Sequence, residues 1–348
     1  MRILLTADPE IPVPPLHYGG IERIVDALAR GLAARGHEVG LVSHRDSSCA
    51  AATLFAWPGA SSASAWDTLR NGLALRSAVR SFRPDLLHSF SRLAYLAPLR
   101  LARLPKIMSY QRHTGPAQAR WGLRLGGPSL SFTACSEFIC RLGRPGGGRW
   151  QPIHNFVEPS QFTFTETVPD DAPLLFLSRV ERIKGPDVAI AIARAAGRRL
   201  IIAGNHADSG PEHDFWTTEI LPHLGKSGIE YVGPVDNVAK AALLAQASAL
   251  LLPIRWDEPF GIVFAEAFAA GTPVITTRRG ATPEIITHAE TGFFAHTVEE
   301  AVAAIHALPS LSRLRCRREA ETRFSATTII TAYESLYQER LRKAGAPS

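Results

Sequence analysis

Short apolar runs alternate along the chain with longer stretches in which hydrophobic residues recur at helical spacing. In the first half, residues 21–34 have the pattern of an amphipathic helix, and the apolar runs are typical of buried parallel strands. The strands expected there are 2–7, 38–43, 85–90, 106–110 and 131–135. The second half repeats the alternation, with strands expected at 174–178, 199–203, 230–232, 249–254 and 274–277, and helices at 186–196 and 262–270. This order predicts an α/β protein with two doubly wound parallel sheets, which bind ligands at the carboxyl ends of their strands.

The two rounds of strands and helices also predict the domain organisation. A polar, proline-containing stretch separates them, and a boundary near residue 165 gives an N-terminal domain 1–165 and a second domain 166–324. Residues 325–348 form a tail that begins as a helix. A length of 348 residues is comfortable for two domains, and no apolar run reaches the roughly 20 residues needed to span a bilayer. The four cysteines form no metal-binding spacing, which favours a reduced, cytoplasmic setting.

Charge is distributed unevenly between the halves. Residues 1–165 carry 19 Lys and Arg against 10 Asp and Glu, whereas residues 166–348 carry 19 against 22. The basic first half favours an anionic partner, such as an acidic glycan, a phosphorylated acceptor or an anionic membrane surface. An equally good interpretation is that Arg replaces Lys in this chain as a compositional habit, so that the positive charge indicates no partner.

The most informative stretch joins an expected strand, 249–254, to an expected helix. Glu258 lies on the intervening loop and Glu266 lies more than one turn into the helix. The helix begins after Gly261, so its unpaired N–H groups favour an anionic ligand such as a diphosphate. The neighbours of Glu266 are apolar, which places its carboxylate awkwardly unless a polar group meets it. The two carboxylates therefore favour recognition of different parts of one long, hydroxyl-rich ligand.

Residues 258–275, EPFGIVFAEAFAAGTPVI, resemble the donor-binding signature of glycosyltransferase family 4. The resemblance implies a GT-B fold, with two Rossmann-like domains facing a central cleft, and a nucleotide-diphosphate sugar as donor. It also implies that the C-terminal helix of 325–348 crosses back to the N-terminal domain. It implies that Glu266 accepts from the ribose and Glu258 from sugar hydroxyls. The remaining donor-binding residues that it implies in this stretch are Phe260, Gly261 and Ile262.

Three further segments agree with the family in order along the chain. Residues 178–185, SRVERIKG, resemble an element that directs Arg179 and Lys184 at the donor diphosphate, with Ser178 where glycine is usual. Gly19 and Gly20 match a glycine pair that approaches the donor, and His113 matches a histidine directed at the reacting sugar. Because protein cations would neutralise the diphosphate, no obligatory metal and no cofactor are expected.

Two basic segments remain. Arg112, Arg120 and Trp121 follow an expected strand in a region of poor periodicity, which we interpret as an acceptor loop, since an aromatic ring between arginines suits a sugar or an anion. The run Arg313 to Arg318 is expected to be a solvated helix face. It has no interleaved aromatic residues, which argues against nucleic acid as a partner.

Together these features predict a retaining glycosyltransferase with His113 and Glu258 at the catalytic centre. It would transfer a sugar from a nucleotide-diphosphate sugar to a glycan, lipid-linked or small-molecule acceptor, in the cytoplasm or at the inner face of the membrane. Two alternatives stay open: a nucleotide-sugar epimerase on the same fold, and a non-catalytic scaffold that binds glycans or partner proteins.

Overall fold

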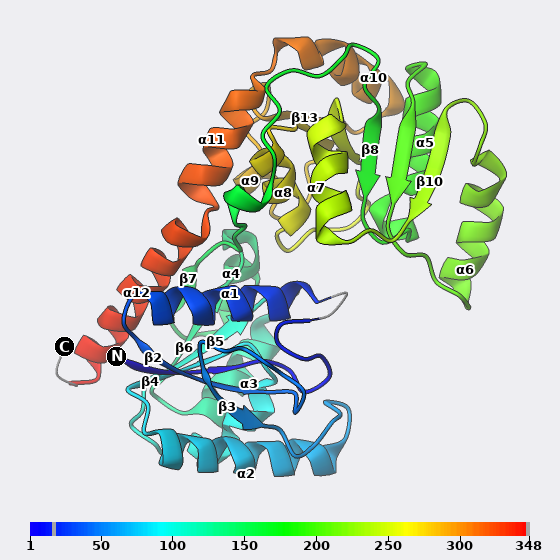
Figure 1. Ribbon diagram of the computed structural model, residues 1–348. Coiled ribbons are helices and arrows are strands. Elements are labelled where there is room, and N and C mark those ends of the chain that lie inside the picture. The colour runs from blue at the N-terminus through cyan, green and yellow to red at the C-terminus, as the bar shows by residue number, and fades with distance from the viewer. Residues whose placement is uncertain (16–18, 346–348) are drawn as a thin grey trace. The chain divides into compact units, whose positions relative to one another are not determined.

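Two separate parallel β-sheets organise the chain, each within its own unit of a computed structural model that describes residues 1–15 and 19–345 (Figure 1). Unit 1 combines Met1–Asn155 with Ala326–Ser348, and unit 2 is the continuous stretch Phe156–Ser325. Buried Leu, Ile, Val and Phe side chains line both sheets. The expected α/β architecture with two doubly wound parallel sheets is confirmed.

The sheet of unit 1 has seven strands, and its order reverses between β1 and β4. In spatial order the strands are β3 (Thr53–Ala56), β2 (Glu38–Ser43), β1 (Arg2–Thr6), β4 (Leu86–Ser89), β5 (Lys106–Tyr110), β6 (Leu130–Ala134) and β7 (Trp150–Pro152). The sheet lies between α1 and α2 (Figure 1). The helices of unit 1 are α1 (Gly20–Ala34), α2 (Ala65–Phe82), η1 (Leu93–Leu99), α3 (Pro116–Gly126), α4 (Glu137–Gly143), η2 (Arg144–Gly146) and α12 (Ala326–Lys343).

The sheet of unit 2 has six strands, and its order reverses between β8 and β11. The spatial order is β10 (Ile229–Gly233), β9 (Leu200–Ala203), β8 (Leu174–Leu177), β11 (Ala249–Leu252), β12 (Val274–Thr276) and β13 (Gly292–Phe294). Its α-helices are α5 (Pro186–Ala195), α6 (Pro211–Phe215), α7 (Asn237–Gln246), α8 (Ile262–Ala270), α9 (Thr282–Ile285), α10 (Val298–Ala307) and α11 (Arg313–Arg323). Its single-turn segments are η3 (Pro159–Gln161), η4 (Arg182–Lys184), η5 (Trp216–Ile220), η6 (Leu221–His223) and η7 (Leu308–Ser310).

The units divide between Asn155 and Phe156, ten residues before the boundary expected at 165. The intervening segment is anchored to unit 2 by backbone bonds. Arg317 of α11 donates to the carbonyls of Pro159 and Phe162, and the N–H of Thr165 donates to the carbonyl of Ala270. The polar composition that indicated a linker therefore belongs to a segment that packs on α8 and α11.

Helix α12 belongs to unit 1, where it packs against α1. Arg35 and His37 both pair with Glu334, and Tyr337 shares a 2.7 Å hydrogen bond with the buried His88 of β4. Complete burial lowers the pKa of His88 to about 3, so its imidazole is neutral in the folded protein. The last three residues of the tail assigned to 325–348 lie outside the described residues.

The arginine run on α11 is only in part the solvated face that the sequence indicated, since Arg315 and Arg318 are exposed but Arg313 is not. Arg313 is buried and donates to the carbonyls of Thr165, Ala245 and Ala247. Burial lowers its pKa to about 10, so the guanidinium stays charged at neutral pH while it satisfies these carbonyls. Within residues 1–15 and 19–345, no helix combines the length and the hydropathy that a membrane crossing requires.

Candidate functional site

The carboxyl ends of β8 and β11 form the point where the strand order of unit 2 reverses. In doubly wound sheets, ligands bind in the crevice outside such a switch point. The loop after β8 carries Arg179 and Lys184, and the loop after β11 carries Glu258 and leads into α8. Two sequence motifs that are more than 70 residues apart are therefore adjacent because their strands pair.

Lys184 and Glu258 meet directly at this edge of the sheet. Their Nζ and Oε2 atoms lie 2.7 Å apart, and both residues are buried. The indole Nε1 of Trp256 donates to the same Oε2 at 2.9 Å, and the ammonium of Lys184 lies 4.5 Å from the centroid of the Trp256 ring. A buried ion pair of this kind is held in place by its extra hydrogen bond and by the cation–π contact.

The backbone of Gly185 allows the two loops to come this close. Gly185 has φ of +75°, and a Cβ at this position would lie 2.2 Å from the carbonyl oxygen of Pro253. A side chain would push the loop that carries Lys184 away from the loop that carries Glu258. Glycine therefore follows the lysine for a reason of packing.

Glu266, on α8, pairs with Lys240 of α7, and both side chains are largely buried. The ammonium of Lys240 also lies 5.8 Å from the centroid of the Phe162 ring. The apolar neighbours of Glu266 predicted that a polar group would meet its carboxylate. Lys240 of the neighbouring helix is that group. Lys240 holds the carboxylate in one orientation, as a preorganised hydrogen-bond acceptor requires.

The other residues predicted to bind the donor lie in the loop after β8, in the loop after β11 and at the start of α8. Arg179 is partly exposed and pairs with Glu181, so its guanidinium remains accessible to an anion. Phe260 is buried against Phe324, Gly261 caps α8 with φ of +80°, and Ile262 is the first residue of α8. The N-terminal amides of this nine-residue helix begin four residues after Glu258.

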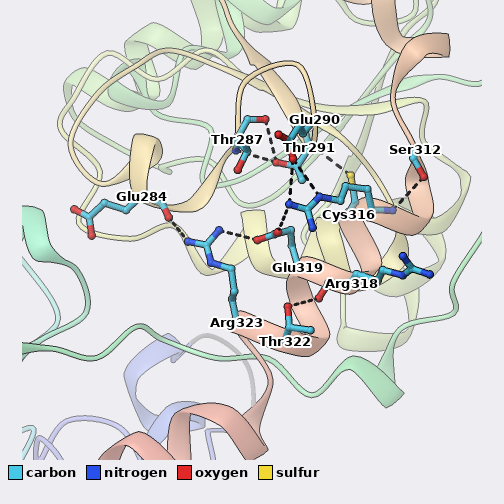
Figure 2. Close-up of polar contacts among 11 residues, drawn as sticks. Glu284, Thr287, Glu290, Thr291, Ser312, Cys316, Arg318, Glu319, Thr322 and Arg323 are labelled. Atoms are coloured by element: carbon cyan, nitrogen blue, oxygen red, sulfur yellow. Dashed lines mark hydrogen bonds and ion pairs between the residues drawn. The ribbon is translucent and has the colours of Figure 1, made fainter.

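The segment that follows Arg279 is fixed to α11. Arg323 donates to the backbone carbonyl of Glu284 and pairs with Glu319, while the carboxylate of Glu284 points away from this cluster (Figure 2). The thiol of Cys316 contacts the carbonyl of Thr291 at 3.7 Å. α11 thereby contacts the loop between β12 and β13 at Glu284 and, just before β13 begins, at Thr291.

In unit 1, the glycine pair and the histidine lie on loops that follow β1 and β5. Gly19 caps α1 and Gly20 is its first residue, and a Cβ on Gly19 would lie 2.9 Å from the Oε2 of Glu22. His113 is exposed and packs edge-on against Phe138 at 5.8 Å between centroids.

Asp8, which the sequence analysis missed, lies two residues beyond β1 and 3.5 Å from the guanidinium of Arg112. Burial, reinforced by the nearby Glu10, raises its pKa to about 6 despite Arg112. Its Oδ1 is buried and accepts no hydrogen bond from the residues that the structure describes. A carboxyl with a raised pKa and an unsatisfied oxygen, at the carboxyl edge of a parallel sheet, is a candidate ligand-binding group.

Replacing Asp8 with Asn should stabilise the protein at pH 8 by about 2 kcal/mol. The pKa of Asp8 is raised on folding, so its contribution to stability is complete below the ordinary value of 3.8 and is lost as the pH rises through about 6. The gain of Asp8→Asn should therefore vanish towards pH 4. Denaturant unfolding at both pH values measures it, with the exposed Asp171→Asn as the reference. A gain that is equal at both pH values would show that ionisation of Asp8 is not the cause.

The two remaining acceptor candidates lie on a helix, not on the loop that the sequence indicated. Arg120 and Trp121 belong to α3, where Arg124 stacks over the Trp121 ring at 5.5 Å. Periodicity failed here because the buried positions of α3 are the small residues Ala119, Gly122 and Gly126. Within the part of the chain that the structure describes, Arg112 is the one acceptor candidate that pairs with a carboxyl, that of Asp8.

The residues missed by the sequence analysis left weak signals. Trp256 stands two residues before Glu258, and Lys240 is one of only five lysines in the chain. Neither position reveals its more distant partner, because the contact of Trp256 with Lys184 joins two loops and that of Lys240 with Glu266 joins two helices. Among the described residues, no group of three or more His, Cys, Asp and Glu is arranged to hold a metal ion.

Comparisons with known proteins follow the same division of the chain. The model of the family "Glycosyltransferase Family 4" matches residues 18–161, and that of "Glycosyl transferases group 1" matches residues 159–323. A glycogen synthase of Mycobacterium tuberculosis is 28% identical, with 97% of this chain and 94% of that protein covered. A solved structure of AviGT4, a glycosyltransferase involved in avilamycin A biosynthesis, is 27% identical with a TM-score of 0.71 and covers 98% of each chain. Anabaena HepE, solved with UDP and glucose, has the same fold, with a TM-score of 0.72 at 17% identity over 97% of this chain and all of HepE.

Proposed function

The chain belongs to the family 4 glycosyltransferases and has their GT-B fold, and from this premise we propose that it transfers a sugar from a nucleoside diphosphate sugar with retention of anomeric configuration. The contact between Lys184 and Glu258 carries the proposal. In such a donor the anomeric carbon is bonded through oxygen to the β-phosphate. A cation for the phosphate and a carboxylate for the sugar hydroxyls must therefore be neighbours.

In the proposed reaction, the bond between the anomeric carbon and the phosphate oxygen breaks, and its electron pair stays on the diphosphate. Lys184, Arg179 and the N-terminal amides of α8 stabilise the charge that develops there. The acceptor oxygen bonds to the anomeric carbon and its proton passes to the departing phosphate. Glu258 orients the sugar, and its pairing with Lys184 links the sugar and phosphate positions.

Gly19 and Gly20 remain predictions for donor binding, and His113 remains a prediction for the reacting sugar. The expectation that no metal is required is likewise part of the proposal. Asp8 and Arg112 extend the proposal to the acceptor, because both lie at the carboxyl edge of the sheet of unit 1. A carboxyl beside a guanidinium suits an acceptor rich in hydroxyls or one that carries a phosphate. The acceptor classes proposed are a glycan, a lipid-linked sugar or a small molecule.

Calorimetric titration with UDP, GDP, ADP and dTDP, without added metal, tests the donor site. Because no motif encodes the base, the titration also selects the donor. We expect one diphosphate to bind selectively and to protect unit 2 against unfolding. NMR of the product formed with the matching sugar then tests retention of configuration. If none of the four binds at millimolar concentration, the proposal fails.

Glu266 should discriminate ribose from deoxyribose in the nucleotide. We expect the preferred nucleoside diphosphate to bind about tenfold or more tightly than its 2′,3′-dideoxy analogue, because a charged acceptor that loses both hydroxyls is left unpaired. Glu266→Ala should abolish this ratio, and Lys240→Met should reduce it by releasing the carboxylate from its fixed orientation. Calorimetry with both nucleotides measures the ratio.

Lys226→Met is the matched control for Lys240→Met, since Lys226 is an exposed lysine of the same unit. Among the contacts of the described residues, its ammonium bonds the backbone carbonyl of Pro222 and no carboxylate. In Lys226→Met, the ratio of the affinities for the nucleoside diphosphate and its 2′,3′-dideoxy analogue should equal that of the unmodified protein. An unchanged ratio in Glu266→Ala would remove the ribose assignment while leaving the diphosphate site intact.

Two other functions give different results in the same assays. An epimerase would change the sugar of the donor with no acceptor present, so product analysis of a donor-only reaction identifies it. A non-catalytic scaffold would bind no nucleotide. The buried pairs of Lys184 with Glu258 and of Lys240 with Glu266 favour the transferase, since each places a charge where the proposed donor needs one.

A further inference from the structure

Helix α2 of unit 1 presents large apolar side chains to solvent. Trp66, Leu69 and Leu73 are 67%, 52% and 53% exposed. They follow each other at helical spacing in the first half of the helix, so they form one continuous outward stripe. Leu101, just after η1, is 93% exposed, and η1 packs against α2. Clustered apolar exposure of this kind marks an interaction surface.

The second half of the same surface is basic. Arg76, Arg80 and Arg100 line a shallow groove between α2 and η1 together with Leu101. Within residues 1–15 and 19–345, none of these three arginines pairs with a carboxylate. The acidic residue of α2, Asp67, is turned towards the N–H of Ser61 instead. The surface therefore combines unpaired cations with an apolar stripe and presents little negative charge.

We propose that the outer face of α2 with η1, the α2 surface, binds an anionic lipid membrane. Tryptophan and leucine at one end would enter the boundary between headgroups and acyl chains, and the arginines would lie at the lipid phosphates. Charge complementarity favours lipid as the occupant. Within unit 1, the sheet lies between α2 and α1, so α2 is an outer layer of this unit (Figure 1).

The position of the stripe links this surface to the edge of the sheet that carries Asp8. α2 precedes β4 in a parallel sheet, so its N-terminal end, with Trp66, lies at the carboxyl ends of the strands. The N–H of Ser62, just before the helix, donates to Glu10 at 2.5 Å, and Glu10 is two residues from Asp8. Membrane binding through α2 would bring the carboxyl edge of unit 1 towards the lipid headgroups. The proposal is independent of the donor site in unit 2.

Sedimentation with lipid vesicles tests the proposal on the full chain. We expect binding to phosphatidylcholine vesicles that contain phosphatidylglycerol, little binding to phosphatidylcholine alone, and weakening by salt. Binding should fall about tenfold or more in Trp66→Ser/Leu69→Ser/Leu73→Ser and in Arg76→Glu/Arg80→Glu/Arg100→Glu. The matched controls in unit 2, exposed Leu221→Ser and Arg194→Glu, should bind as the unmodified protein does.

A second measurement is independent of the folding of the multiple variants. Brominated lipids should quench tryptophan fluorescence of the unmodified protein, and Trp66→Phe should remove most of that quenching. The proposal is overturned by absence of binding to anionic vesicles, or by unchanged binding of both triple variants. It is also overturned if the apolar variant dissociates an oligomer without lipid, since the stripe would then be an interface between copies of this chain.

Discussion

Lys184→Met should lower the free energy of unfolding by about 3 kcal/mol and weaken binding of the nucleoside diphosphate at least about tenfold. Lys184 and Glu258 are both buried, and removal of the ammonium leaves the carboxylate with the indole of Trp256 as its remaining donor in the contacts of the structure. The same change removes a cation from the proposed diphosphate position. Stability is measured by denaturant unfolding, and affinity by calorimetry.

A double variant separates these two effects. In Lys184→Met/Glu258→Gln the buried charge is gone from both partners, so most of the stability should return while turnover stays low. Lys226→Met should change neither quantity. Wild-type affinity and turnover in Lys184→Met would remove the diphosphate assignment, whatever happens to stability.

Gly280→Ala should lower turnover about a hundredfold, because it displaces the backbone of Glu258. Gly280 has φ of +58°, and its Cβ would lie 2.4 Å from both the N and the O of Glu258. The N–H of Ala281 donates to that same carbonyl at 2.8 Å, so the loop after β12 and the loop after β11 move together. Turnover with the donor selected by calorimetry measures the effect.

Gly197→Ala controls for the backbone conformation alone. Gly197 has φ of +62°, and its Cβ would meet nothing within 4 Å. Both variants should lose about 1–2 kcal/mol for an alanine in the left-handed region. In addition, turnover should fall in Gly280→Ala, whereas it should stay unchanged in Gly197→Ala. Equal turnover in the two variants would contradict a positioning role for Gly280.

The sequence predicted the parts of the fold whose buried positions are apolar without interruption. The strands at 174–178 and 249–254 and the helix at 262–270 correspond to β8, β11 and α8. α2 was missed because Asn71, Gly72 and Ala78 interrupt its inward face, which also holds Leu75 and Phe82, while Trp66, Leu69 and Leu73 face outward. A pattern of hydrophobicity indicates what could be buried, and it fails where a helix uses small residues inside and large ones outside.

The candidate site was predictable in its motifs and not in its pairings. The resemblance of residues 258–275 and 178–185 indicated Glu258, Glu266 and Lys184, but their contacts depend on which strands and helices are neighbours. The pairing of Asp8 with Arg112 joins the ends of β1 and β5, which are separated in the sheet by β4. Burial of Arg313 was also hidden, since its acceptors are backbone carbonyls that have no sequence signature.

Unit 1 is assembled from two stretches of chain with the whole of unit 2 between them. The N–H of Val157 donates to the carbonyl of Phe324 at 2.9 Å, so the two ends of unit 2 lie together. Unit 2 can therefore fold as a domain that is inserted into unit 1. On the ribosome, residues 156–325 are synthesised before α12. Until that helix emerges, the surfaces that Tyr333 and Tyr337 cover, including His88, have no native partner. The unit translated first is therefore the unit completed last, and the nascent chain must keep an unfinished sheet from aggregating while the second one folds.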